Sequence, residues 1–244
     1  MGRRRPTTRH RSVAIVVLAK YPAPGRVKTR LAATIGAPAA TALYGAFVRD
    51  LAHRLGRTRH AVWWAFTPPA APFSRLVGTR RCFPQHGPDL GARIHHATRV
   101  VALRSGGPVI ALGADAPHVS RREIARAART LVRGTDVVLG PAADGGYYLI
   151  GVRVPCRALF AGIAWGTSRV AAATRRRCRV LGLSCLEVAR DFDVDGIEEL
   201  MALVRVVRRR PREFPETRAV LSRLTRRVGW PRLEASPSWG CARR

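Results

Sequence analysis

Lysine is almost missing from this chain. Its 244 residues include 44 basic side chains, and only Lys20 and Lys28 among them are lysines. Both lie in one short segment, directly after an apolar run at residues 12–19. A lysine amine is a compact point charge, whereas an arginine guanidinium is a planar fork, so the two are not interchangeable. The segment is therefore the first place to look for chemistry.

Cysteine is also scarce, and its spacing excludes two kinds of site. The five cysteines are odd in number and form no C-x-x-C pair, which argues against a disulfide framework and against a zinc site. This pattern is typical of a reducing compartment, so we expect a cytoplasmic protein. The five are Cys82, Cys156, Cys178, Cys185 and Cys241.

Long hydrophobic runs are missing as well. No segment approaches the roughly 20 apolar residues of a membrane span. The basic stretch before residues 12–19 gives the N-terminus a superficial likeness to a signal peptide. That apolar run is only about eight residues long and no small-x-small cleavage site follows it, so we interpret it as a core strand.

Acidic residues are few, at 15 against 44 basic ones, which gives a formal net charge of +29. Such a charge suggests nucleic acid or another polyanion as a partner. The arginines are scattered, however, and accompany abundant Ala, Gly and Pro, as a GC-rich genome would produce. We therefore expect no specific nucleic-acid partner, and keep nucleic-acid binding as the alternative from another class.

Apolar strand-like runs alternate with helical patterns along most of the chain. This alternation predicts an α/β fold with a mostly parallel central sheet and helices on both faces, in which ligands bind at the carboxyl ends of the strands. The expected strands are 12–19, 60–66, 108–113, 136–140 and 147–152. The expected helices are about 38–55, 90–104, 120–133, 168–179 and 196–210. We expect a basic disordered tail at 1–11, one domain over 12–210, and a C-terminal helix with a basic tail over 211–244.

The lysine segment combines fixed turns with four positive charges. Proline and glycine fix the shape of the loop, and its cations precede a helix whose free amides would favour a phosphate. Neither a P-loop nor a G-x-G-x-x-G pattern is present, and a solvated basic loop is the alternative. The candidate nucleotide-binding residues are Lys20, Pro24, Gly25, Arg26, Lys28 and Arg30.

Asp115 directly follows the apolar run at 108–113. A carboxylate at the end of a buried strand is costly unless a positive charge neutralises it. Mg²⁺ or Mn²⁺ bridging to a diphosphate would do so, because hard cations prefer oxygen ligands. The alternative is an aspartate that caps a helix or stabilises a turn.

The turn Asp144-Gly145-Gly146-Tyr147 permits close backbone approach to a ligand. Asp144 could act as a base, and the glycines and Tyr147 could contact a donor sugar or an acceptor. The alternative is a tight turn between two strands, with Tyr147 in the core.

An acidic cluster, Asp191-Phe192-Asp193-Val194-Asp195, stands out in a basic chain. Alternation places its three aspartates on one side of an extended segment. We expect Asp195 to cap the following helix, and Asp193 to be the better candidate for a metal ligand.

Two helix entries carry weaker signals. Asp89 is expected to be an N-cap, and with Gly91 it could contact a base or ribose. Trp165 precedes another helix and could contact a sugar, or the segment around it could serve only as a cap.

Together these segments resemble the DUF2064 family of GT-A-like glycosyltransferases, some of which are labelled arsenosugar-biosynthesis glycosyltransferases. The matching stretches cover about residues 12–200. They read AKYPAPGRVKTRL, QHGPDLGARI, GADAP, GPAADGGYYLIG, WGTSRV and DVDGIEEL. Ala114 and Ala116 stand where the family usually has serines.

The resemblance implies a GT-A-like three-layer α/β/α sandwich that uses Mg²⁺ or Mn²⁺ to hold a nucleotide diphosphate. It implies glycosyl transfer from a nucleotide-diphospho-sugar to a small-molecule acceptor. From the motifs above, we expect Asp115, Asp144 and Lys28 to have catalytic roles and Asp115 with Asp193 to hold the metal. Related 2-phospholactate guanylyltransferases share the architecture, so nucleotidyl transfer from an NTP with release of pyrophosphate is the alternative. Donor, acceptor and oligomeric state stay open.

Overall fold

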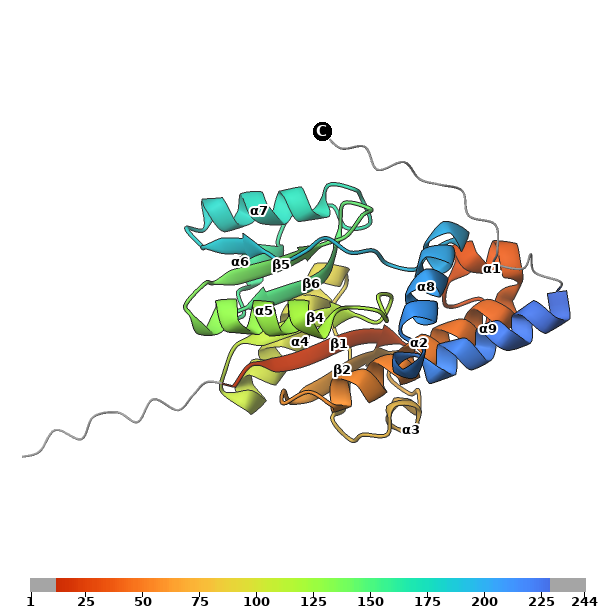
Figure 1. Ribbon diagram of the computed structural model, residues 1–244. Coiled ribbons are helices and arrows are strands. Elements are labelled where there is room, and N and C mark those ends of the chain that lie inside the picture. The colour runs from red at the N-terminus through yellow and green to blue at the C-terminus, as the bar shows by residue number, and fades with distance from the viewer. Residues whose placement is uncertain (1–11, 229–244) are drawn as a thin grey trace, which may run out of the picture.

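The computed structural model describes residues 12–228 (Figure 1). The expected basic tail at 1–11 and the last part of the expected C-terminal region lie outside the described residues. The strands are β1 (Ala14–Lys20), β2 (Val62–Thr67), β3 (Cys82–Pro84), β4 (Val109–Gly113), β5 (Val137–Pro141), β6 (Tyr147–Val152) and β7 (Cys185–Glu187). They form a 7-stranded sheet in the order β3-β2-β1-β4-β6-β5-β7.

The sheet is mostly parallel. β6 alone among these strands runs antiparallel to its neighbours, β4 and β5. Because β5 and β6 form a hairpin, the turn between them returns to the edge of the sheet where β1 and β4 end. One edge therefore collects the lysine loop, the Asp115 loop and the Asp144 turn.

Helices cover both faces of the sheet, as the alternation of patterns predicts. One core packs against α1 (Thr29–Ile35), α2 (Ala37–Gly56), α3 (Phe73–Val77), α5 (Arg121–Val132), α8 (Ile197–Arg209) and α9 (Pro215–Val228). The other packs against α4 (Leu90–Ser105), α6 (Arg157–Phe160) and α7 (Val170–Val180). A 3-10 turn, η1 (Pro211–Glu213), precedes α9. In Figure 1, α1, α2, α8 and α9 gather at the end of the sheet toward which β1 points.

β1 shows why the central strands read as continuous apolar runs. Ile15 and Val17 belong to one core, while Ala14 and Val16 belong to the other. All four are essentially inaccessible to solvent. Alternate side chains of a strand point to opposite faces, so a strand covered on both sides needs apolar residues throughout. Burial of each valine or isoleucine contributes roughly 1.5–3 kcal/mol.

Local capping agrees with the sequence in part. Ser120 caps α5 by accepting a hydrogen bond from the Arg122 amide, at 3.1 Å. The Ser120-Arg121-Arg122-Glu123 spacing is that of a capping box, but Glu123 instead accepts the Ala189 amide at 3.0 Å. The glutamate thus fastens the segment after β7 to the start of α5, a tertiary contact that local spacing does not reveal.

The C-terminal helix α9 packs against α2, and its first turn is held by a buried side chain of that helix. The Asp50 carboxylate accepts hydrogen bonds from the Glu216 and Thr217 amides, at 3.0 and 2.8 Å. Arg49 pairs with the Glu216 carboxylate at 2.9 Å. A helix N-terminus favours an anionic partner, so Asp50 satisfies amides that would otherwise lack one. Within the described part of the chain, no helix is both long and apolar enough to cross a membrane.

Candidate functional site

A cavity of 590 Å³ lies at the carboxyl ends of β1 and β4. This is the location expected for a ligand in an open α/β sheet. The cavity brings together charged residues that the sequence singled out separately, and Gln85 and Tyr44 also line it. The predicted site residues on its wall are Lys20, Lys28, Arg30, Asp115, Tyr147 and Asp193.

Lys28 sits at the base of this cavity, with its side chain 2% exposed. Its Nζ contacts the Asp115 carboxylate and lies 3.0 Å from Asp195 Oδ1. Burial lowers the pKa of the amine, but the two aspartates outweigh this effect and leave the pKa above its ordinary value. Lys28 is therefore a charged ammonium ion at neutral pH.

The backbone at Lys28 is left-handed, with φ at 50° and ψ at 46°. A non-glycine residue seldom adopts this conformation, which costs about 1 kcal/mol or more. Lys28 is also the residue before α1, and its carbonyl accepts the Ala32 amide at 2.7 Å. The side chain is thereby aimed away from the helix and toward Asp115.

Tyr44 of α2 contacts both lysines of the lysine loop. Its hydroxyl accepts a hydrogen bond from the Lys20 amide at 3.0 Å, and the Lys28 amine lies 5.7 Å from its ring centroid. Burial raises the pKa of the Tyr44 hydroxyl, with a further contribution from the Asp115 charge, so the phenol stays neutral. Sequence reasoning missed Tyr44, because nothing in its helix distinguishes it from a core tyrosine.

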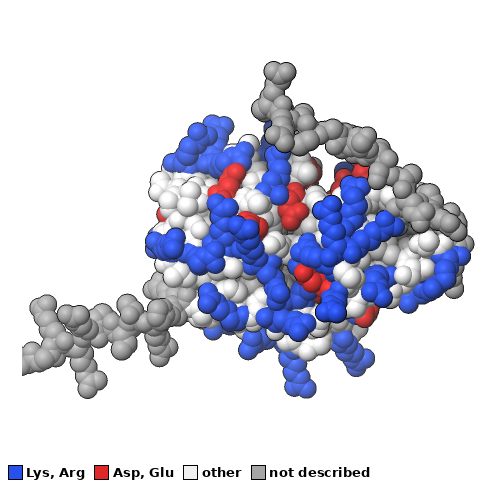
Figure 2. Space-filling view, in the orientation of Figure 1, with Lys and Arg blue, Asp and Glu red and all other residues white. Residues whose placement is uncertain are grey.

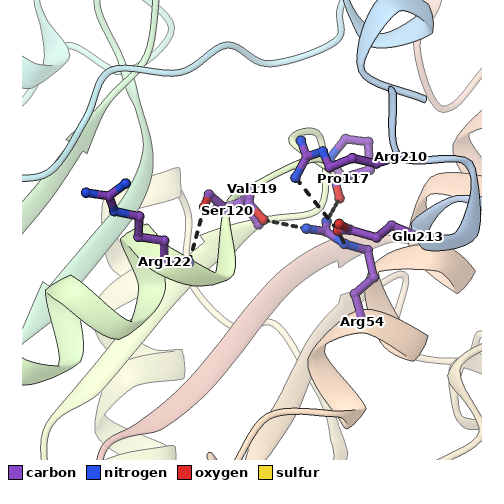
Figure 3. A network of polar contacts seen from close by, with 7 residues as sticks. All are labelled: Arg54, Pro117, Val119, Ser120, Arg122, Arg210 and Glu213. Carbon is purple, nitrogen blue, oxygen red and sulfur yellow. Dashed lines mark hydrogen bonds and ion pairs between the residues drawn. The ribbon is translucent and has the colours of Figure 1, made fainter. Parts of the chain in front are cut away.

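The loop after Asp115 is fixed by Arg54 (Figure 3). This buried side chain of α2 donates to the Pro117 carbonyl and to the Val119 carbonyl, the latter at 2.8 Å. Its Nε also pairs with Glu213, at 3.0 Å. The arginine therefore connects the Asp115 loop to α2 and to the turn before α9.

His118 joins the Asp115 loop to the acidic cluster. Its Nε2 lies 2.8 Å from Asp191 Oδ1, and its ring stacks on Phe192 with centroids 4.0 Å apart. The Val194 amide also donates to the Asp115 carbonyl, at 3.0 Å. These contacts hold the two acidic segments side by side.

The expectation that the three aspartates of the cluster share one side holds for two of them, because Asp193 and Asp195 line the same cavity while Asp191 does not. Asp191 faces His118, whereas Asp195 reaches Lys28. The expectation that Asp195 caps α8 is wrong, because Gly196 precedes that helix and Glu199 accepts the Gly196 amide at 2.8 Å. An ion pair with a buried ammonium is stronger than a bond to an exposed helix amide.

Asp193 lines both the cavity and a smaller neighbouring one. Its Oδ1 is buried and has no hydrogen-bond partner among the described residues. Burial raises the pKa of Asp193 to about 7, with the Asp115 charge adding to this effect and Lys28 opposing it. A buried carboxylate oxygen without a partner is unfavourable unless a cation occupies the space beside it.

Mg²⁺ or Mn²⁺ fits this chemistry. Asp115 and Asp193 offer hard oxygen ligands, and Asp193 Oδ1 has no hydrogen-bond partner among the described residues, so these two carboxylates could hold such a cation. Within residues 12–228, no three Asp, Glu, His or Cys side chains form a complete metal site. Mg²⁺ is usually held by one or two carboxylates, with substrate phosphates and waters supplying its remaining ligands.

The Asp144 turn lies beside the smaller cavity of 360 Å³, which shares Arg30, Asp193 and Asp195 with the first. Asp144 is exposed on its wall, and its Oδ1 accepts the Gly146 amide at 2.8 Å. Gly145 has φ of +88°, and a Cβ there would lie 2.0 Å from the Ser168 carbonyl oxygen. Glycine is thus required for the turn to pack against the segment that leads into α7.

Several predicted site residues lie outside both cavity walls. Pro24, Gly25 and Arg26 form an exposed turn, in which the Arg26 amide donates to the Ala23 carbonyl at 3.0 Å. They shape the lysine loop without lining the cavities.

The second group of such residues supports α4. Asp89 is its N-cap, as expected, and accepts the Ala92 amide at 2.7 Å. Gly91 packs so tightly on Trp165 that a Cβ would lie 2.4 Å from the indole. Trp165 in turn meets the Tyr147 ring edge to face, with centroids 6.3 Å apart. Trp165 therefore packs behind the cavity-lining tyrosine.

Acidic residues concentrate at the site although the chain is strongly basic. Six of the chain's 15 acidic side chains line the two cavities. They are Asp115, Asp144, Asp193, Asp195, Glu198 and Glu199. On the visible face in Figure 2, Lys and Arg side chains are spread broadly rather than gathered in one patch. The site is therefore much richer in acidic side chains than the chain as a whole.

Comparison with known proteins identifies related chains. Residues 48–167 match the family model described as "Uncharacterized protein conserved in bacteria (DUF2064)". A crystal structure from Desulfovibrio desulfuricans G20, provisionally assigned as a nucleotide-diphospho-sugar transferase, is 32% identical with a TM-score of 0.79. The match covers 88% of this chain and 97% of that one. The GT-A-like α/β fold expected from the sequence is confirmed.

More distant structures share the fold alone. CMP:2-keto-3-deoxy-manno-octonic acid synthetase complexed with CTP is 14% identical, with a TM-score of 0.51 over 82% of this chain and 99% of that one. A cytidylyltransferase from Leptospira borgpetersenii serovar Hardjo-bovis (strain JB197) is 13% identical, with a TM-score of 0.50 over 83% of this chain and 96% of that one. A search of curated proteins found no match.

Proposed function

Since the chain belongs to the DUF2064 family, we propose that it is a metal-dependent transferase acting on a nucleotide-activated donor. The reaction that we favour is glycosyl transfer from a nucleotide-diphospho-sugar to a small-molecule acceptor. The observation that carries the proposal is the meeting of Lys28, Asp115 and Asp193 in one cavity at the carboxyl ends of β1 and β4. The D. desulfuricans relative, which matches over most of both chains, supports the same class of donor.

In this proposal the larger cavity holds the nucleotide diphosphate. Lys20, Lys28 and Arg30 lie on its wall and would bind phosphate oxygens. Asp115 and Asp193 would hold Mg²⁺ or Mn²⁺. The bound cation would neutralise the diphosphate and offset the charge that grows on the leaving group. Lys28 and Arg30 would contribute to the same stabilisation through their positive charges.

The smaller cavity would hold the acceptor. It adjoins the larger one through Arg30, Asp193 and Asp195, so an acceptor there would face the donor. Its hydroxyl oxygen would attack the sugar, the bond from the sugar to the diphosphate would break, and Asp144 would take the hydroxyl proton. Asp144 is exposed on this wall and is oriented by the Gly146 amide.

The substitution Asp115→Asn tests the proposal, because it removes charge and metal affinity with little change in shape. Thermal shifts with a panel of nucleotides and nucleotide sugars, with and without Mn²⁺, measure binding. We expect Mn²⁺-dependent stabilisation of the wild type and its loss in the variant. Unchanged activity and unchanged Mn²⁺-dependent binding in Asp115→Asn would show that the metal role is wrong. Asp136→Asn, a carboxylate outside both cavities, is the control.

Nucleotidyl transfer from an NTP is the second candidate. Four cations, Lys20, Lys28, Arg30 and Arg93, line the larger cavity, and a triphosphate needs more neutralisation than a diphosphate. Product analysis separates the reactions, since nucleotidyl transfer releases pyrophosphate while glycosyl transfer releases a nucleoside di- or monophosphate. Nucleic-acid binding, in contrast, would weaken steeply with salt and would not respond to Asp115→Asn.

A further inference from the structure

Lys28 lies where two of the site's carboxylates converge. Its amine contacts Asp115 and lies 3.0 Å from Asp195 Oδ1. The lysine side chain is 2% exposed, whereas the two aspartates are 47% and 51% exposed. The carboxylates are thus open to a cation arriving from solvent while the amine is beneath them.

The single positive charge of Lys28 does not neutralise all the carboxylates around it. One ammonium pairs with Asp115 and Asp195, and Asp193 Oδ1 has no partner among the described residues. An ammonium and a divalent cation compete for these oxygens, because two positive charges held about 4 Å apart repel each other strongly.

The Lys28 amine can move away from the two aspartates without a change in the backbone of Lys28. Its left-handed conformation is the entry to α1, and the hydrogen bond from the Ala32 amide to its carbonyl holds it there. The four-carbon stem has several rotatable bonds, so a change of rotamer can move the amine within the cavity that it lines.

We propose that Lys28 is an exchangeable counter-ion, whose amine competes with a divalent cation for Asp115 and is released to the diphosphate when the cation binds. The proposal rests on the function proposed above. In this proposal one side chain couples the two binding events. The binding of the metal to the carboxylates compensates for the lost ion pairs with Lys28, and the freed amine increases the affinity for phosphate. Lys28 therefore opposes metal binding alone but favours metal and diphosphate together.

Lys28→Met tests this coupling, because the two effects have opposite signs. Mn²⁺ titrations followed by electron paramagnetic resonance would measure metal affinity, with inorganic pyrophosphate as the diphosphate probe. Without pyrophosphate, we expect the variant to bind Mn²⁺ about tenfold more tightly than the wild type; at saturating Mn²⁺, we expect it to bind pyrophosphate about tenfold more weakly. Unchanged or weaker Mn²⁺ binding by a folded variant would overturn the proposal.

Lys20→Met is a matched control. It removes the same charge from the wall of the same cavity, but Lys20 contacts neither aspartate in the structure. We expect its Mn²⁺ affinity to change less than about twofold, as for a screened charge. An equal gain in Mn²⁺ affinity in both variants would overturn the proposal, since general electrostatics would then account for the effect.

The wild-type chain offers a measurement that does not depend on a variant. Because the chain has only two lysines, ¹⁵N-lysine labelling gives two side-chain signals, which Lys20→Met assigns. We expect saturating Mg²⁺ to shift the Lys28 signal and pyrophosphate to shift it again. A Lys28 signal unaffected by Mg²⁺ that binds would overturn the exchange and leave the proposed function standing. A wild type that binds neither Mn²⁺ nor any nucleotide would overturn both.

Discussion

The Asp193 carboxyl group, whose Oδ1 is buried without a hydrogen-bond partner among the described residues, leads to a quantitative prediction about stability. Its pKa is raised from 3.8 to about 7 in the folded chain, with burial as the main cause. The folded state therefore holds a proton that the unfolded state releases, so the stabilising contribution is complete below about pH 4 and is lost as the pH rises through about 7. Linkage with these values predicts that the wild type loses about 1 to 2 kcal/mol between pH 6 and pH 8 from this group.

The substitution Asp193→Asn removes the titration while keeping the shape of the side chain. Urea unfolding in the presence of a chelator, at about pH 6, 7 and 8, measures the free energy of unfolding of both proteins. Histidines titrate in the same range, but they contribute to both chains and cancel in the difference. We expect the variant to gain about 1 to 2 kcal/mol relative to the wild type over this range. Parallel pH profiles would refute the buried, cation-deficient environment assigned to Asp193.

Three further substitutions probe the framework of the site. Arg54→Met leaves two carbonyls and Glu213 without their buried partner, so we expect a loss of about 3 kcal/mol in urea unfolding, and a loss below about 1 kcal/mol would contradict it. Gly145→Ala should lower the melting temperature far more than Gly166→Ala. Both glycines have positive φ, but of the two only Gly145 has a backbone carbonyl where a Cβ would lie. Equal melting temperatures of the two variants would be inconsistent with this packing. His118→Phe keeps the stacked ring but loses the hydrogen bond to Asp191. We expect its Mn²⁺ affinity, measured by titration, to be about tenfold weaker. Unchanged Mn²⁺ affinity would show that this hydrogen bond does not position the acidic segment.

The central strands and long helices could be predicted because burial leaves a strong pattern in them. The strand expected at 108–113 is observed at Val109–Gly113, and the helix expected at 38–55 is observed at Ala37–Gly56. The short elements could not be predicted. β3 and β7 have three residues each, too few to show a period, and α1 follows a loop rich in proline and glycine.

The site was foreseeable where one residue carries the signal alone. Asp115 follows a buried strand, and Lys28 is one of two lysines, so each could be named from its surroundings in the sequence. The partners could not. Arg54 is one arginine among many, His118 is an unremarkable turn residue, and the role of Asp195 depends on a lysine 167 residues away.

That separation has a consequence for the order in which the site can be built. During synthesis from the N-terminus, Lys28 emerges with no acidic partner, gains Asp115 midway, and meets Asp195 only after most of the chain is complete. Arg54 similarly meets its partner Glu213, and Asp50 its partner Thr217, only after most of the chain has been made. Closing such long loops is entropically costly and comes late in folding. A nascent or truncated chain that stops before residue 191 thus contains all seven strands of the sheet yet lacks Asp193 and Asp195 of the cavity wall, so partial products of translation should be inactive.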